Sequence, residues 1–96
     1  KLAPALVAGN SVVLKPTPEA PYTAYAFAKL FIDSPYAIKD ALSVVYGDAK
    51  VGSALVTSPI PRKISFTGSV PVGKIILQNA GIKKVTLELG GNAATF

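Results

Sequence analysis

Apolar residues follow two different spacings along the chain, and the spacing changes near most of the prolines and glycines. Short, nearly continuous apolar runs rich in β-branched residues predict buried strands at residues 11–15, 41–46, 63–66 and 84–89. In the stretches between them, apolar residues recur every three or four positions, which predicts helices at residues 1–8, 19–34, 48–58 and 69–80. Proline and glycine stand at the boundaries because they favour turns and end regular structure.

The expected elements alternate strictly between helix and strand. Near-continuous apolar strands separated by helices are typical of a parallel sheet that is covered by helices on both faces. We therefore expect an α/β fold with an open, mainly parallel, doubly wound (Rossmann-like) sheet of four βα-type units. Half of the 96 residues are hydrophobic and only 16% are charged, which is apolar for an independent domain of this size. We expect residues 1–96 to be part of a larger domain, truncated at both ends.

Charge and composition narrow the function classes. The formal net charge is +5, but the basic residues are scattered in runs of at most two, with a single arginine. Nucleic-acid binders usually cluster their positive charge on one face or arm, so we expect no nucleic-acid partner. The modest excess of positive charge is compatible with a small ligand that carries phosphate. The sequence has no cysteine and no histidine, which argues against a disulfide framework and a thiolate metal site. No apolar run reaches the roughly 20 residues of a membrane span, and a cytoplasmic location is the default expectation.

Four turns are candidate ligand sites, because ligands of open parallel sheets bind beyond the carboxyl ends of the strands. These turns lie at residues 15–18, 46–48, 67–69 and 88–91. In the third turn, Gly68 allows close approach of a ligand to the backbone, and Ser69 precedes a helix whose free N–H groups favour phosphate. The simpler interpretation is a tight turn with a capping serine. The G-x-G-x-x-G fingerprint of many dinucleotide sites is absent.

Two charged residues stand at the ends of expected buried strands. The ammonium of Lys15 can bind ribose hydroxyls or a phosphate, or it can simply extend into solvent. Alternation along residues 85–89 places Glu88 on the face opposite the apolar residues of that strand. Partial desolvation there would raise the pKa of the carboxyl group and suit a general base. A structural ion pair with Lys83 or Lys84 is the alternative interpretation.

Four motifs, in this order and spacing, together resemble the aldehyde dehydrogenase superfamily. They are PALVAGNSVVLKP at residues 4–16, ISFTGS at 64–69, Val72-Gly73, and VTLELGGN at 85–92. The resemblance covers essentially the whole chain. It implies part of the coenzyme-binding domain of an enzyme that oxidises an aldehyde to a carboxylic acid with NAD or NADP, through a cysteine thiohemiacetal and thioester. It also implies a parent enzyme that is a homodimer or homotetramer.

The resemblance also implies roles for individual residues. It makes Glu88 the general base, places Lys15 at the adenine ribose or its 2′-phosphate, and places Ser69 at the pyrophosphate. Further coenzyme-binding residues are expected in the same turns and beside them: Pro16, Thr17, Pro18, Gly47, Phe66, Thr67, Gly68, Val72, Leu89 and Gly90. No metal site is expected.

Some features depart from the family pattern. The sequence contains no cysteine, and the family's oxyanion-stabilising asparagine would precede Lys1, so we do not expect the fragment to be active alone. NAD-preferring members often carry an acid three residues after the lysine, where this chain has Pro18, followed by Glu19. NAD and NADP therefore both remain open, as does the identity of the aldehyde. The alternatives are a coenzyme A-acylating member of the family and a non-catalytic nucleotide-binding or structural module.

Overall fold

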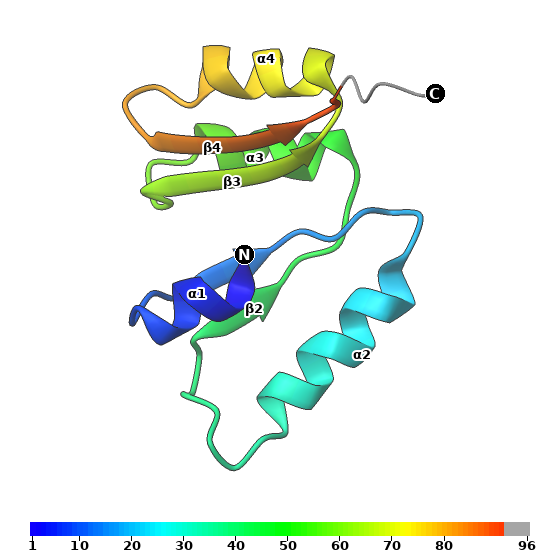
Figure 1. Cartoon of the computed structure of the whole chain (residues 1–96), viewed down its shortest axis with the longest axis vertical. Coiled ribbons are helices and arrows are strands. Elements are labelled where there is room, and N and C mark those ends of the chain that lie inside the picture. Colours follow the sequence, from blue (N-terminus) through cyan, green and yellow to red (C-terminus); the bar gives the residue numbers. More distant parts are fainter. Residues whose placement is uncertain (92–96) are drawn as a thin grey trace. The chain divides into compact units, whose positions relative to one another are not determined.

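A computed structural model describes residues 1–91 and contains all eight expected elements in the expected order. They are α1 (Leu2–Val7), β1 (Val12–Leu14), α2 (Pro21–Ile32), β2 (Leu42–Val44), α3 (Ala49–Thr57), β3 (Lys63–Gly68), α4 (Val70–Asn79) and β4 (Lys84–Leu89) (Figure 1). The chain divides into two compact units, Lys1–Val51 and Gly52–Phe96. Asn92, the last residue of the fourth motif, lies outside the described residues.

Each unit is built on one pair of parallel strands. In the first unit β1 pairs with β2, from Val12 opposite Leu42 to Leu14 opposite Val44. In the second unit β3 pairs with β4 over six residues. Parallel strands require a crossover connection, and α2 and α4 supply these crossovers. The predicted α/β class with parallel strands is thus confirmed.

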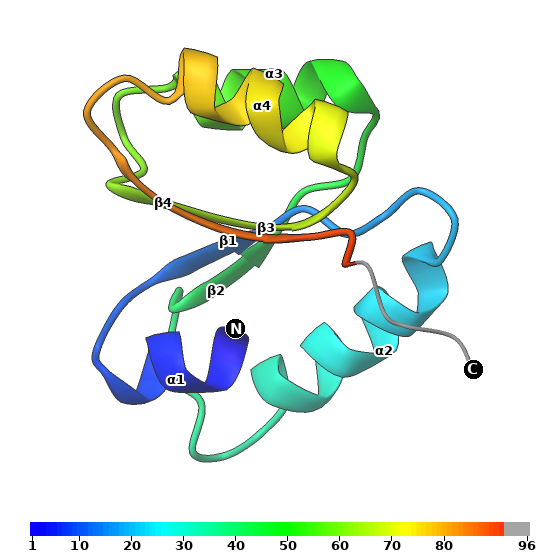
Figure 2. The same ribbon diagram turned by 45° about the horizontal axis from the view of Figure 1, so that its top comes forward.

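The first unit has a small core on one side of its strand pair. Ala28 of α2 and Leu42 of β2 are buried, whereas Val13 in the middle of β1 is half exposed because its side chain points to the opposite face. α1 contacts β1 and α2 contacts β2. Figure 2 shows both helices on the same side of this pair.

The second unit has a continuous core between its helices and its strands. Val56 of α3 and Ile76 and Ala80 of α4 are buried there. They pack against half-buried side chains from alternate positions of both strands, namely Ile64, Phe66, Val85 and Leu87. Both helices lie on the same side of the pair in Figure 2. The alternation predicted along the fourth strand is therefore confirmed.

The other side of β3 and β4 is polar and exposed. Its six side chains come from the intervening positions of the two strands: Lys63, Ser65, Thr67, Lys84, Thr86 and Glu88. We call this surface the polar face. Because side chains alternate between the two sides of a strand, every residue of this set is directed away from α3 and α4.

Local signals fix the ends of the helices. The side chain of Asp48 accepts a hydrogen bond from the backbone N–H of Lys50 at 2.9 Å, so it caps the start of α3. After α4, Gly81 has a φ of +62°, which glycine adopts without steric cost and which ends the helix. None of the helices within residues 1–91 is long and apolar enough to cross a membrane.

Candidate functional site

The expected site residues lie at the carboxyl ends of the strands in both units. In the first unit they form what we call the lysine edge, which comprises Lys15, Pro16, Thr17, Pro18 and Gly47. In the second unit they form the glutamate edge, which comprises Phe66, Thr67, Gly68, Ser69, Val72, Glu88, Leu89 and Gly90. Parallel pairing explains both groupings, because it brings the carboxyl ends of neighbouring strands together.

At the lysine edge, the Lys15 ammonium ties the ends of β1 and β2 to one another. Its Nζ donates a hydrogen bond of 3.0 Å to the carbonyl oxygen of Pro16 and another of 3.0 Å to that of Gly47. The side chain is half buried, and Pro16 is buried beside it. The interpretation of Lys15 as a lysine that simply extends into solvent is therefore wrong.

Tight packing holds the Gly47 carbonyl that accepts one of these bonds. A Cβ atom placed on Gly47 would lie 2.3 Å from Cγ2 of Val51, in the first turn of α3. A contact under 3.0 Å is essentially never seen for real Cβ atoms. Gly47 thus lets α3 begin directly against the end of β2, and the Asp48 cap fixes that helix start.

The rest of the lysine edge is exposed. Thr17 and Pro18 are exposed, and the Thr17 hydroxyl donates a hydrogen bond to the carboxylate of Glu19. A negative charge therefore stands in the same turn as Lys15, two residues before α2 begins at Pro21.

At the glutamate edge, Thr67 and Glu88 stand opposite one another in the register of β3 and β4. The Thr67 hydroxyl donates a hydrogen bond of 3.4 Å to Oε2 of Glu88. This contact orients the carboxylate on the polar face, at the carboxyl end of the strand pair.

Glu88 is exposed, which corrects the expectation of a partly desolvated carboxylate. The physical reason is that α3 and α4 cover the opposite side of the strands, so no described residue of the second unit buries it. Within residues 1–91, Lys84 forms no ion pair with Glu88, which lies four residues, or about 13 Å, further along β4. Lys83 instead donates from Nζ to the carbonyl of Ala80 at 3.2 Å.

The start of α4 has a serine that makes no side-chain capping hydrogen bond. Ser69 occupies the N-cap position, as expected, with an extended backbone at φ −73° and ψ 152°, but its side chain makes no capping hydrogen bond. The simple capping interpretation therefore does not account for its hydroxyl. The first N–H groups of a helix have no partner within the helix, and they carry the positive end of its dipole.

Two glycines shape the glutamate edge by close approach. A Cβ atom on Gly68 would lie 2.4 Å from Cζ of Phe66, and one on Gly73 would lie 2.7 Å from Cδ2 of Leu89. Gly68 therefore accommodates the Phe66 ring, while Gly73 lets α4 pack onto the end of β4. Val72, between these positions, is 43% exposed and open to contact.

Gly73 is a close-packed residue beside the glutamate edge that the sequence analysis does not single out. It forms part of the third motif, and it is buried where a Cβ atom would clash with the Leu89 side chain. A signal was present, because glycine in a helix interior costs about 1 kcal/mol relative to alanine. A glycine inside an expected helix therefore indicates that another element packs closely against the helix at that position.

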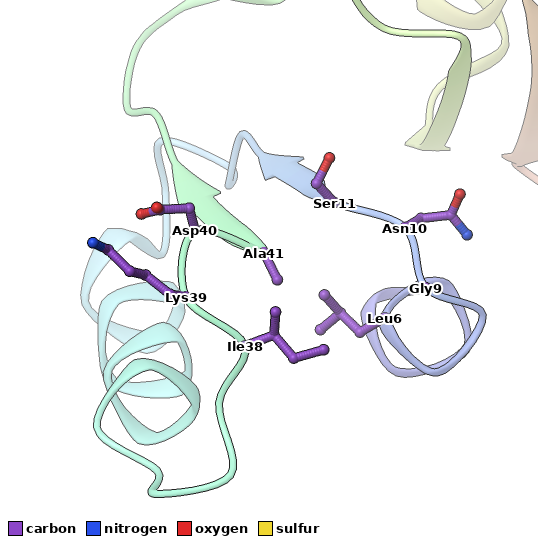
Figure 3. Close-up of a pocket in the computed structure, with 8 residues that line it drawn as sticks. All are labelled: Leu6, Gly9, Asn10, Ser11, Ile38, Lys39, Asp40 and Ala41. Carbon is purple, nitrogen blue, oxygen red and sulfur yellow. The ribbon is translucent and has the colours of Figure 1, made fainter.

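Two hollows lie in the first unit. One, of about 190 Å³, lies at the amino ends of β1 and β2, where Leu6, Ile38 and Ala41 converge while Lys39 and Asp40 point away (Figure 3). The other, of about 360 Å³, is an open aromatic hollow beside the lysine edge, lined by Pro21, Tyr22, Tyr25 and Tyr46. Over the described residues 1–91, no three histidine, cysteine or acidic side chains gather to hold a metal ion.

Comparison with known proteins gives the same family throughout. The model of the aldehyde dehydrogenase family matches residues 1–96. The chain is 49% identical to succinate semialdehyde dehydrogenase of Acinetobacter baylyi, over 97% of this chain and 20% of that protein. The crystal structure of an aldehyde dehydrogenase from Bartonella henselae matches with a TM-score of 0.91 and 43% identity, over 98% of this chain and 20% of that one.

A glyceraldehyde-3-phosphate dehydrogenase from Methanocaldococcus jannaschii, complexed with NADP, is also similar. Its structure matches with a TM-score of 0.88 and 36% identity, over 95% of this chain and 21% of that one. The chain thus spans about one fifth of the length of the relatives that it matches.

Proposed function

Because the chain belongs to the aldehyde dehydrogenase family, we propose that it supplies coenzyme-binding residues and the general base of an NAD(P)-dependent aldehyde dehydrogenase. The activity is proposed for the whole protein, of which residues 1–96 form part of the dinucleotide-binding domain. The observation that carries the proposal is the position of the residues concerned. Those that the family resemblance implicates lie at the carboxyl ends of parallel strands, where α/β proteins bind ligands.

The lysine edge fits a ribose or its phosphate. Two N–H groups of the Lys15 ammonium bind backbone carbonyls, and an ammonium has three. The third can donate to a ribose hydroxyl or to a 2′-phosphate. We therefore keep both NAD and NADP as coenzymes, with Lys15 as the positive charge that binds either of them.

The glutamate edge fits a pyrophosphate and supplies the base. The uncapped Ser69 hydroxyl and the N–H groups at the start of α4 are suited to phosphate oxygens, and Gly68 places no Cβ in their way. When bound, the coenzyme would accept the hydride that the aldehyde carbon loses. Val72 and Gly90 are exposed beside these groups and can contact the coenzyme.

Glu88 is proposed to take a proton from water. Thr67 holds its carboxylate on the polar face, and an ionised carboxylate there can accept the proton of a water molecule that attacks a thioester carbonyl carbon. The bond between that carbon and the cysteine sulfur then breaks, which gives the carboxylic acid and a thiolate, and the proton held by Glu88 returns to the sulfur or to solvent. This sequence contains no cysteine, so we propose that the nucleophile comes from another part of the whole protein.

The direct test is the whole protein mixed with aldehydes and either coenzyme. Aldehyde-dependent formation of NADH or NADPH, with release of the carboxylic acid, is the expected result. Coenzyme binding without turnover of any aldehyde would favour the non-catalytic module. A product that forms only with coenzyme A would indicate an acylating member. A homodimeric or homotetrameric state and a cytoplasmic location remain parts of the proposal.

Replacement of Lys15 by methionine is expected to weaken coenzyme binding by roughly 10- to 100-fold, because a hydrogen bond to a charged group contributes about 1.5–3 kcal/mol. Titration of the whole protein with NAD and NADP, followed by fluorescence, measures this change. Lys39→Met is the matched control, since Lys39 is exposed and lies at the amino end of β2. Equal affinity in the Lys15 variant would remove this residue from the site.

A further inference from the structure

The amino ends of β3 and β4 gather four cations that the sequence shows only as two separate pairs. They are Arg62, Lys63, Lys83 and Lys84. The register places Lys63 opposite Lys84, and the Lys84 N–H donates to the carbonyl of Arg62 at 3.2 Å. Charge that is scattered along the chain is therefore concentrated by the strand pairing at one end of the second unit.

One of these cations has a structural partner. Lys83 donates from Nζ to the carbonyl of Ala80 at 3.2 Å, at the end of α4, where the negative end of the helix dipole favours a cation. Lys63 and Lys84 differ, since both are exposed on the polar face. Within residues 1–91, neither of these two lysines forms an ion pair with a carboxylate.

The ammonium groups of Lys63 and Lys84 repel one another. Neighbouring strands lie about 4.8 Å apart, and like charges directly opposite one another in a sheet are destabilising. Residues 52–91 contain a single acid, Glu88, which lies four residues further along β4, or about 13 Å away. Residues 52–91 therefore provide no carboxylate close enough to offset the repulsion between the two lysines.

We propose that Lys63 and Lys84 are the anchor at which an acidic polypeptide segment of the whole protein docks onto the polar face. A segment that complements the positive charge of these two lysines carries carboxylates where it lies against them. Beyond the lysines, Ser65 and Thr86 stand opposite one another as a second polar pair. An extended acidic segment can contact the lysine pair and then the hydroxyl pair, which lies two residues, or about 7 Å, further along the strands. The inference does not depend on the proposed enzymatic function.

Zero-length carbodiimide cross-linking of the whole protein tests the proposal, because it joins an amine to a carboxylate only where the two are in contact. Mass spectrometry is expected to find Lys63 or Lys84 joined to an aspartate or glutamate outside residues 52–91. Lys74 of α4 is the control, since it is exposed on a helix and has no opposed cation. Cross-links at other lysines but none at Lys63 or Lys84 would overturn the proposal.

The sign of a stability change gives a second test. With an acidic partner, the double variant Lys63→Met, Lys84→Met is expected to lower the melting temperature of the whole protein by about 2 °C. Lys84→Arg is expected to keep the parent value. A rise in the double variant would show relief of repulsion and no partner. Stabilisation of the parent by inorganic phosphate, lost in the double variant, would identify a phosphate site instead.

Discussion

Replacement of Glu88 by glutamine is expected to lower steady-state aldehyde oxidation by the whole enzyme about 100- to 10,000-fold, the range that general acid–base catalysis contributes. Glutamine keeps the size of the side chain and can still accept the hydrogen bond from Thr67, but it cannot take a proton from water. The affinity for coenzyme is expected to stay unchanged, because the contacts proposed for Lys15 and Ser69 are untouched.

Rapid-mixing kinetics locate the defect. The variant is expected to form one equivalent of reduced coenzyme per active site and then to stall, since hydride transfer precedes the hydrolysis that Glu88 is proposed to assist. Glu19→Gln is the matched control, because it removes a carboxylate that contacts Thr17 of the lysine edge and leaves the glutamate edge intact. A steady-state rate equal to that of the parent would rule out Glu88 as the base.

The second large effect is expected at Gly68. Gly68→Ala is expected to destabilise the protein by about 1–3 kcal/mol, the range for overpacking a well-packed site, because the new Cβ would lie 2.4 Å from the Phe66 ring. That ring belongs to the core beneath α3 and α4 and cannot move without loss of its contacts there. Denaturant unfolding of the whole protein measures the change. Weaker coenzyme binding is expected with it, since Gly68 directly precedes Ser69 and the start of α4.

Two comparisons separate a steric cause from a general intolerance of alanine. Gly91→Ala is the matched control, because no atom lies within 4 Å of the position of its Cβ. The double variant Phe66→Leu, Gly68→Ala removes the clashing Cζ atom, so the two changes are expected to be strongly non-additive. Additive losses would show that the ring is not the obstacle.

The sequence was sufficient to predict features that depend on neighbouring positions along the chain. The fourth strand begins and ends at Lys84 and Leu89 as expected, because polar and apolar residues alternate along its whole length. The cap at Asp48 and the helix stop at Gly81 follow in the same way, from the local chemistry of a carboxylate and of a residue without a Cβ.

Features that depend on a second element were not predictable from the sequence. Periodicity separates the two faces of β4, but it does not show whether anything covers the face that bears Glu88. The two carbonyl partners of Lys15 lie 1 and 32 residues away, and the second is defined only once β1 and β2 pair. The residue type predicted the N-cap position of Ser69 and not the absence of a capping bond.

The two hydrogen bonds of Lys15 have a consequence for the entropy of the coenzyme binding proposed for this residue. A free lysine side chain loses rotamer freedom that corresponds to about 1.5–2 kcal/mol when a ligand orders it. Here the carbonyls of Pro16 and Gly47 hold the ammonium at 3.0 Å each, without any contribution from a ligand. Most of that ordering is therefore completed when the chain folds, and a coenzyme bound at Lys15 as proposed would meet a preorganised charge.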